Sequence, residues 1–348
     1  MKTAKIECVV CTYNAASAPF AMDRQRVPVT RGDILQFRRR LLHWYDRHKR
    51  DLPWRQDRDA YRVWLSEIML QQTRVAAVLE HYREFVKRFP SVQRLARARE
   101  SSVLAAWSGL GYYRRARMLR RAATEIASKH RGQFPDTAAK LRDLPGIGPY
   151  TSAAIASICF GEPIAVVDGN VERVLGRVMG RNLSRAEAWQ FAQRFLNPNR
   201  PGDFNQAMME LGATVCVPRQ PRCFLCPVSD LCATRGELPR IAIKPRQKKR
   251  EISYLLDRRN GSVFLTRRRQ ESSLMPGMWE LPEIPSANGS REAWITVRHS
   301  ITTTDYLVRV VKRRASDITQ GSWVRVNCLT QLPLTGLTRK ILLAAKVI

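Results

Sequence analysis

The segment LPGIGPYTSAAIAS, residues 144–157, decides the fold. Gly146 and Gly148 lie in it between two apolar segments with helical spacing. Glycine can adopt a positive φ and lets the backbone approach a ligand, and the N–H groups that open the following helix attract an anion. Glycines also occur in tight turns between helices for steric reasons alone. The segment by itself therefore predicts a helical hairpin, with phosphate binding and plain turn geometry as its two interpretations.

Helical spacing extends outward from this hairpin over most of the chain. From about residue 33 to 234, apolar residues recur at helical intervals between short polar or Gly/Pro connections. Beyond a basic, proline-containing stretch come short runs rich in β-branched and aromatic residues, such as SVFLTRR and YLVRVV. We expect an N-terminal extension without fixed structure (1–30), an all-α domain (31–235), a basic linker (236–250) and a small α+β domain (251–348).

The charge of the chain indicates a polyanionic partner. Sixty Lys and Arg against thirty Asp and Glu give a formal net charge of +30, more than solubility requires. No apolar run approaches the roughly 18 residues of a membrane-spanning helix. A short apolar patch near the N-terminus is bracketed by Glu7 and Asn14, which leave it too short for a signal peptide, and the nearby pair Cys8 and Cys11 is interpreted as incidental. We expect a cytoplasmic nucleic-acid-binding protein that does not enter a membrane.

A group of four cysteines follows the helical region with the spacing C-x6-C-x2-C-x5-C. Four thiolates this close together suit one metal centre, either a [4Fe–4S] cluster or a structural zinc ion, and disulfides could use the same residues in a secreted chain. A single C-x2-C unit with longer arms favours the cluster. The residues are Cys216, Cys223, Cys226 and Cys232.

Together, the cysteine loop and the hairpin resemble the endonuclease III superfamily of DNA glycosylases. The resemblance implies a [4Fe–4S] cluster that does not itself cleave the base, and a helix-hairpin-helix motif that binds DNA phosphate at Gly146 and Gly148. The segment VVDGNVERV resembles the exit of that hairpin. Asp168 alone would be interpreted as a helix N-cap, and the resemblance adds a carboxylate that stabilises positive charge on the deoxyribose. It also implies that Asn170 holds the backbone near the cleaved bond.

Two positions separate this chain from the strand-cleaving members of the superfamily. Those enzymes carry a lysine in the hairpin that forms a Schiff base with the sugar, and the matching position here is Tyr150. The string YRVWLSEIMLQQTRV resembles the motif of MutY-type adenine DNA glycosylases, which carries a catalytic glutamate at the position of Glu67. Its spacing alone would also allow Glu67 to lie on the solvated face of a helix. The resemblance implies a monofunctional adenine glycosylase.

The chemistry explains the need for a carboxyl group at Glu67. Adenine leaves poorly unless a ring nitrogen is protonated, so a general acid is required near neutral pH. Burial among apolar side chains raises a carboxyl pKa toward that range. We expect Glu67 to protonate N7 of adenine while Asp168 stabilises the oxocarbenium-like sugar.

Further residues match those that handle the extruded base and the gap it leaves, since chemistry on a base requires its removal from the stack. The resemblance places Trp54 and Arg55 at the adenine pocket, with FNQAMMELG, residues 204–212, packed nearby. It assigns four residues to intercalation beside the orphaned guanine: Gln72, Thr73, Leu110 and Tyr112. The adjacent arginines at positions 114, 115 and 117 are interpreted as phosphate contacts or as a solvated face.

The C-terminal part resembles the Nudix-like lesion reader of MutY-type enzymes, most clearly in MPGMWELPE, residues 275–283. The acidic hydrolase motif of Nudix enzymes is missing, so no nucleotide hydrolysis is expected. The family's Phe-Ser-His triplet is replaced by Ile301, Thr302 and Thr303. Thr302 supplies a comparable hydroxyl, but the histidine is missing, which weakens the expected preference for 8-oxoguanine over guanine.

These observations predict a monomeric adenine DNA glycosylase of base-excision repair, acting on double-stranded DNA with A:8-oxoguanine or A:G mispairs. Two alternatives remain at this level. One is a bifunctional, endonuclease III-like glycosylase and lyase, and the other is a non-catalytic iron–sulfur DNA-binding protein.

Overall fold

The computed structural model describes residues 29–239, 248–272, 274–285, 293–301, 304–315, 318 and 320–348. The N-terminal extension up to residue 28, most of the basic linker, and Thr302 with Thr303 lie outside the described residues, and so do the expectations placed on them. Within the described part, no helix has the length and apolar character needed to cross a membrane.

The region from residue 29 to 239 is helical, as the apolar spacing predicts. Its α-helices are α1 (Arg31–His48), α2 (Ala60–Leu70), α3 (Val75–Arg88), α4 (Val92–Arg97), α5 (Glu100–Ala106), α6 (Arg114–Lys129), α7 (Ala138–Leu141), α8 (Pro149–Cys159), α9 (Gly169–Val178), α10 (Arg185–Phe195) and α11 (Pro201–Thr214). Short 3-10 helices are η1 (Pro53–Arg55), η2 (Cys223–Leu225) and η3 (Ser229–Leu231).

Local sequence signals begin many of these helices. Thr30 and Asp33 form a capping box at α1, and Ser184 and Glu187 form another at α10, so that otherwise unpaired backbone N–H groups are satisfied. Proline occupies the first position of α8 and of α11, where its missing N–H costs nothing. The helix boundaries are therefore encoded within a few residues of each end.

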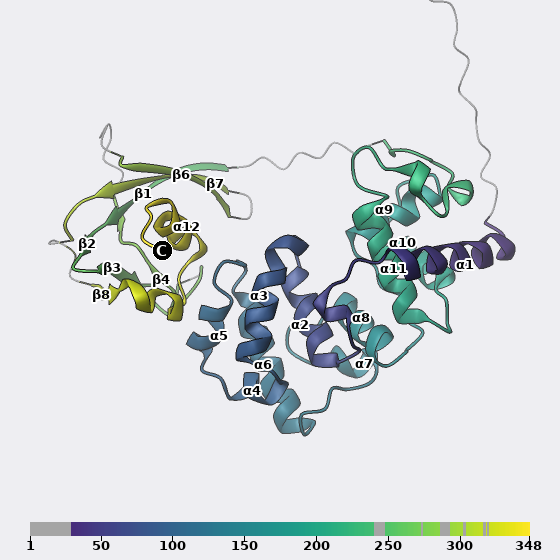
Figure 1. Cartoon of the computed structure of the whole chain (residues 1–348), viewed down its shortest axis with the longest axis horizontal. Coiled ribbons are helices and arrows are strands. Elements are labelled where there is room, and N and C mark those ends of the chain that lie inside the picture. Colours follow the sequence, from purple (N-terminus) through teal and green to yellow (C-terminus); the bar gives the residue numbers. More distant parts are fainter. Residues whose placement is uncertain are drawn as a thin grey trace, which may run out of the picture.

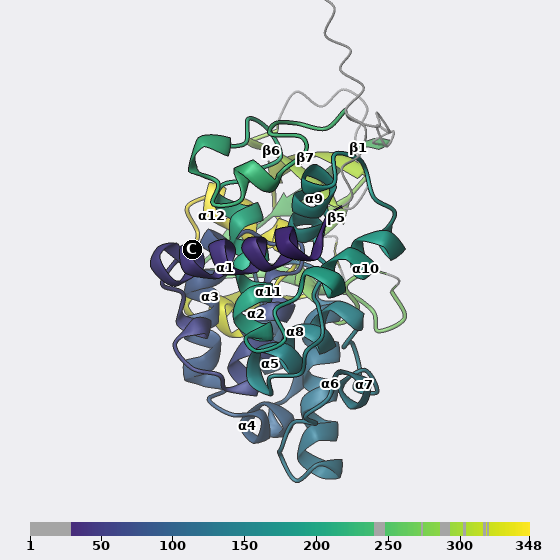
Figure 2. The same cartoon turned by 90° about the vertical axis from the view of Figure 1, so that its right-hand side faces the viewer.

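The helices form two lobes with separate cores, a division that the single predicted domain did not contain. One core unites α2 to α6 with the start of the hairpin and α8, through large buried side chains such as Trp64 and Trp107. The other unites α1 with α9, α10 and α11, through Phe37, Phe195 and Phe204. Figures 1 and 2 show α1 lying beside α9 to α11, although more than a hundred residues separate them in the chain.

The described residues of the C-terminal domain form one mixed sheet, one antiparallel sheet and one α-helix, which agrees with the predicted α+β class. Its elements are β1 (Lys248–Leu256), β2 (Arg258–Arg259), β3 (Ser262–Arg267), β4 (Trp279–Glu280), β5 (Glu283–Ile284), β6 (Ile295–Ile301), β7 (Thr304–Lys312), β8 (Ser322–Arg325), the 3-10 helix η4 (Val326–Gln331) and α12 (Gly336–Ala344). The first three residues of β1 belong to the segment expected to be linker, so the linker ends earlier than predicted.

One sheet has the strand order β5-β1-β7-β6, with β1 and β7 parallel, and the other is built around β3. Alternation along β1 sends Tyr254 and Leu256 into the main core of this domain and Leu255 into a smaller cluster with Phe264. The C-terminal domain packs against the α2–α8 lobe, because its Met278 is fully buried in that lobe's core. Figure 1 shows the three parts in a row, with the α2–α8 lobe in the middle.

Candidate active site

Glu67 lies inside the protein rather than on a solvated helix face. It belongs to α2, and only 7% of the residue is exposed. Burial is the main cause that raises the pKa of Glu67 to about 7. A hydrogen bond with Tyr150 acts against this rise, the negative charge of Asp168 adds to it, and the positive charge of Arg55 acts against it. A carboxyl group with this pKa can hold and release a proton near neutral pH.

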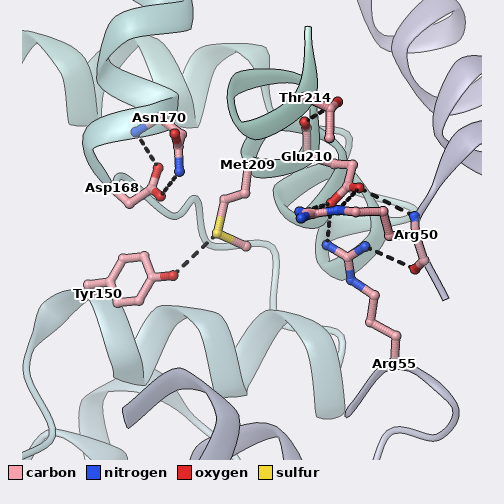
Figure 3. Close-up of polar contacts among 8 residues, drawn as sticks. All are labelled: Arg50, Arg55, Tyr150, Asp168, Asn170, Met209, Glu210 and Thr214. Carbon is pink, nitrogen blue, oxygen red and sulfur yellow. Dashed lines mark hydrogen bonds and ion pairs between the residues drawn. The ribbon is translucent and has the colours of Figure 1, made fainter. Parts of the chain in front are cut away.

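Tyr150 lies in the first turn of α8 and faces the same site. Its hydroxyl has one proton, which can be donated to the sulfur of Met209 on α11 at 3.3 Å (Figure 3) or to the carboxylate of Glu67. Burial and the charges of Glu67 and Asp168 raise the pKa of the phenol well above its ordinary value. Tyr150 is therefore a neutral hydrogen-bonding group, and its phenol has no amine with which to attack a carbon atom.

Asp168 is the N-cap of α9, as its position before a helical segment predicted. Oδ1 accepts hydrogen bonds from the backbone N–H groups of Asn170 and Val171 at 2.9 and 2.8 Å, and Oδ2 accepts from Nδ2 of Asn170 at 2.7 Å. These three donors fix the orientation of the carboxylate at the N-terminus of α9. Figure 3 shows Asp168 and Asn170 together on one side of Met209.

The pair of carboxylates provides two different chemical capabilities. Glu67, from one lobe, holds a proton near neutral pH, while Asp168, from the other, is a fixed anion whose charge reaches Glu67. One proton donor and one anion are the groups required to break a glycosidic bond through a cationic sugar. The site can therefore perform N-glycosidic cleavage.

Arg173 extends the hydrogen bonds of Asn170 toward the cysteine loop and was not identified from the sequence. Its Nη2 donates to Oδ1 of Asn170 at 2.8 Å, and its Nε donates to the carbonyl oxygen of Cys216 at 2.8 Å. The helix α11 can approach α9 closely because Gly212 has no side chain. A Cβ at this position would lie only 2.6 Å from the Cβ of Asn170. Arg173 belongs to the quoted segment VVDGNVERV, where its position one turn after Asn170 was the available signal.

Glu210 on α11 is a second buried carboxylate that the sequence reasoning missed. Its side chain has no exposed area, and it accepts hydrogen bonds from Nε of Arg50 at 2.6 Å and from Nη2 of Arg55 at 2.8 Å (Figure 3). Burial alone would raise the pKa of Glu210, but the two arginines outweigh that effect and lower it. Glu210 lies within the quoted FNQAMMELG, yet a single acidic residue in an apolar helix carries no local sign of distant arginine partners.

The residues predicted to border the adenine pocket or to intercalate into DNA fall into a buried group and an exposed group. Trp54 is buried and packs edge-on against Tyr82. Arg55 forms an ion pair with Glu210, and its positive charge lowers the pKa of Glu67. Leu110 is also buried in the lobe's core. Tyr112 is 50% exposed and Gln72 is exposed. Of the predicted intercalating residues, these two reach furthest into solvent, whereas Thr73 is partly buried.

The hairpin has the geometry that its two glycines suggested. Gly146 has a φ of +76°, and a Cβ there would lie 2.6 Å from the Cβ of Met118, so this glycine is required by the turn itself. Gly148 caps α8 with a negative φ and has open space around it. The exposed start of α8 is therefore accessible to an anion from solvent.

The four cysteines lie in the loop that follows α11, around η2 and η3. All four are partly buried free thiols. Burial raises the pKa of Cys226 to about 12, and the charges of the other three thiols add to this rise, so the sulfurs are near one another. Among the described residues, no three His, Cys, Asp or Glu side chains converge as they would on a single ion. A set of four thiols without nitrogen or oxygen donors fits the ligand preference of an iron–sulfur cluster.

Arg177 holds the first part of this loop. It is buried and donates to the carbonyl oxygens of Val217 and Pro218 and to the sulfur of Cys216. These contacts fix the path of the backbone from Cys216 to Pro218.

Comparisons with known proteins confirm the family that the sequence motifs resemble. Residues 65–196 match the family described as "HhH-GPD superfamily base excision DNA repair protein". The chain is 49% identical over 218 residues to the adenine DNA glycosylase of Homo sapiens, covering 58% of this chain and 40% of that protein. It is 31% identical over 307 residues to the adenine DNA glycosylase of Buchnera aphidicola subsp. Baizongia pistaciae, covering 84% of this chain and 87% of that protein. The matched part spans less than half the length of the mammalian relatives.

Solved structures support the helical fold. A thermostable thymine-DNA glycosylase is 30% identical, with a TM-score of 0.56 over 60% of this chain and 98% of that chain. An endonuclease III trapped in a covalent intermediate with DNA is 20% identical, with a TM-score of 0.52 over 59% of this chain and 97% of that chain.

Proposed function

Because this chain belongs to the adenine DNA glycosylase family, within the HhH-GPD superfamily of base excision DNA repair proteins, we propose that it hydrolyses the N-glycosidic bond of adenine mispaired with 8-oxoguanine or guanine in double-stranded DNA. One observation carries the proposal. The buried Glu67, with a pKa of about 7, faces Tyr150 and the fixed carboxylate of Asp168 across the two lobes.

In this proposal Glu67 is the general acid. It donates its proton to N7 of adenine, so that the base leaves as a neutral molecule, and a general acid is most effective when its pKa lies near the working pH. Arg55 and Trp54 border the adenine, and Glu210 keeps Arg55 in position through its ion pair. Glu67 then accepts a proton from the water molecule that completes hydrolysis.

Asp168 stabilises the positive charge that develops at the anomeric carbon of the deoxyribose. Its three N–H partners keep the carboxylate oriented, so little reorganisation is needed during the reaction. Asn170 maintains this orientation. Tyr150 occupies the position of the lyase lysine, and since a phenol cannot form a Schiff base, the enzyme leaves an abasic site without cutting the strand.

DNA is held by the basic surface and the hairpin, and the adenine is extruded with help from the exposed loops. The start of α8, with Gly146 and Gly148, binds a phosphate. Gln72, Thr73, Leu110 and Tyr112 fill the space beside the orphaned guanine. The C-terminal domain reads the opposite base, with the hydroxyl of Thr302 as a candidate contact. The enzyme acts as a monomer on DNA in the cytoplasm.

The cofactor of the proposal is a [4Fe–4S] cluster held by Cys216, Cys223, Cys226 and Cys232. It supplies a rigid, redox-capable crosslink of the loop and takes no part in base release. The purified protein should absorb near about 400 nm, as iron–sulfur proteins do, and contain iron. Cys226→Ser should lose this absorption, whereas Cys328→Ser, at an exposed cysteine of the C-terminal domain, should keep it. Zinc without iron in the purified protein would contradict the assignment.

The test of activity uses duplexes with adenine opposite 8-oxoguanine, guanine or thymine, analysed with and without alkali. We expect strand breaks only after alkali, and only for the two mispairs. Breaks without alkali would indicate a lyase, and release of oxidised pyrimidines instead of adenine would favour the endonuclease III-like alternative. Full activity of Glu67→Gln would remove Glu67 as the acid. Binding without base release by the intact protein would favour a non-catalytic DNA-binding function.

A further inference from the structure

Arg115, in the first turn of α6, points into the protein instead of toward solvent. The sequence interpretation treated it, with its neighbours at positions 114 and 117, as a phosphate contact or part of a solvated face. Its guanidinium instead donates hydrogen bonds to the two loops expected to enter the base stack. Nη1 donates to the carbonyl oxygens of Ile68 (2.7 Å), Met69 (3.1 Å) and Gln71 (2.7 Å), and Nη2 donates to those of Leu110 (3.1 Å) and Gly111 (3.4 Å) and to Oγ1 of Thr73 (3.4 Å).

These acceptors connect the loops to the helix that carries Glu67. The helix α2 ends at Leu70, and the last carbonyl groups of a helix have no partner within it. Arg115 supplies that partner, and its positive charge suits the negative end of the helix dipole. The same guanidinium lies over the rings of Trp107 and Tyr112, at 5.4 and 5.5 Å from their centroids.

Both loops contain a non-glycine residue in the left-handed region. Gln72 has a φ of +55° and Tyr112 has a φ of +48°. Such a conformation is unfavourable for a residue with a Cβ, so it persists only where the surroundings hold it. In each case the preceding carbonyl group, that of Gln71 or Gly111, is bound by Arg115. The contact therefore fixes the backbone immediately before each exposed side chain.

We propose that Arg115 is a positioning residue that holds Gln72 and Tyr112 as one rigid wedge, set in a fixed relation to the helix of Glu67. The inference rests on the proposed function, in which these two side chains enter the base stack. Extrusion of a base costs a few kcal/mol. A wedge that is ordered before binding can apply its binding energy to that extrusion, whereas a loose wedge must first be ordered.

The two-sided contact requires the shape of arginine. A guanidinium presents five N–H donors in a planar fork, whereas a lysine carries one compact ammonium group on a flexible stem. Lysine at position 115 keeps the positive charge, but its ammonium group can donate hydrogen bonds to only one of the two loops at a time. Loss of function in Arg115→Lys therefore separates bridging from charge.

The experiment measures unstacking and binding separately. Arg115→Gln and Arg115→Lys are made in full-length protein that also carries Glu67→Gln, so that the DNA stays intact. The matched controls are Arg121→Gln and Arg121→Lys, at an exposed position of the same helix. A duplex with 2-aminopurine beside the mispaired adenine reports unstacking by a rise in fluorescence. Anisotropy of the same duplex reports binding, and thermal unfolding reports folding.

We expect both Arg115 changes to abolish most of the fluorescence rise at saturating protein, while the Arg121 changes leave it intact. When the same Arg115 changes are made in protein that keeps Glu67, adenine release under single-turnover conditions should be slower by roughly 10- to 100-fold for either variant, the range for lost hydrogen bonds to a charged group. Unfolding temperatures within a few degrees of the parent would show that folding is intact. A normal fluorescence rise in a folded Arg115→Gln protein, or full rescue by lysine, would overturn the inference.

A failure of the proposed function would look different. The unsubstituted protein, with Glu67 in place, would then release no adenine from either mispair. The fluorescence comparison between positions 115 and 121 would still decide whether Arg115 holds a DNA-unstacking wedge.

Discussion

The hydroxyl group of Tyr113 donates a hydrogen bond to the carbonyl oxygen of Leu334 at 2.8 Å and thereby joins the start of α6 to the C-terminal domain. Ser108 donates to the same oxygen at 3.3 Å. Arg117, further along α6, donates to the carbonyl oxygen of Pro276 at 2.6 Å. The proposed lesion-reading domain is thus attached directly beside Tyr112, so the two parts proposed to contact the mispair share one junction.

Replacement of Met278 by alanine should destabilise the helical region, although this residue belongs to the C-terminal domain. Met278 is fully buried in the core of the α2–α8 lobe, and removal of a buried methionine side chain costs about 2–5 kcal/mol. Urea unfolding measures the effect. Leu274→Ala, at an exposed position of the same loop, should change the free energy of unfolding by less than about 0.5 kcal/mol. Equal effects of the two changes would mean that the junction does not stabilise the fold.

The carboxyl group of Glu67 should destabilise the folded protein at alkaline pH. Its pKa rises from 4.5 to about 7 on folding, so between these values the folded state holds a proton that the unfolded state has released. Stability contributed by the protonated form is therefore lost as the pH rises through this range, and the full penalty is present above about pH 7.

The variant Glu67→Gln has an uncharged side chain at every pH, so it tests whether the ionised carboxylate of Glu67 destabilises the folded protein. It should raise the free energy of unfolding by about 3 kcal/mol at pH 8 and by about half as much at pH 5.5. Urea unfolding at the two pH values measures the difference. A gain that is the same at both pH values would contradict a raised pKa. The same variant should lose adenine release, because the stabilising change removes the acid.

Glu210→Gln should destabilise the protein strongly. The substitution leaves Arg50 and Arg55 without the buried carboxylate that neutralises them, and breaking a buried ion pair from one side costs about 3–5 kcal/mol. Glu125→Gln breaks a partly exposed pair with Lys129 on α6 and should cost less than about 1 kcal/mol. Urea unfolding compares the two. A loss no greater for Glu210 than for Glu125 would show that the two arginines find other partners.

The two hairpin glycines should respond differently to alanine. Gly146→Ala places a Cβ in the left-handed region, which costs roughly 1–2 kcal/mol, and overlap with Met118 adds to that. Gly148 has a negative φ and open space, so Gly148→Ala should leave stability within about 0.5 kcal/mol.

DNA affinity provides the second measurement for this pair. If a phosphate approaches the start of α8, Gly148→Ala should weaken binding of a duplex in an anisotropy titration although its stability is normal. Unchanged affinity would assign Gly148 to the turn alone. Similar stability losses for both glycines would contradict the distinction between them.

Features that depend on neighbouring residues were predictable from the sequence. Asp168 as an N-cap, the turn at Gly146 and the change from helices to strands near residue 250 all depend on a few adjacent residues. The burial of Glu67 was not fixed by the spacing of its helix, which also allowed a solvated position; the family resemblance favoured the buried one, which the structure has.

Features that depend on residues far apart in the chain were decided by the tertiary structure. The sequence by itself determined the element types, the hairpin, the cysteine loop and the two proposed catalytic carboxylates, since each is written in a short pattern. It did not show that α1 completes the lobe of α9 to α11, that Glu210 neutralises two arginines some 155 residues away, or that Arg115 faces inward. Helical spacing says which face of a helix is apolar, but not which distant face covers it. A charged residue looks the same in sequence whether its partner is water or a buried backbone carbonyl, so only the packed structure could distinguish them.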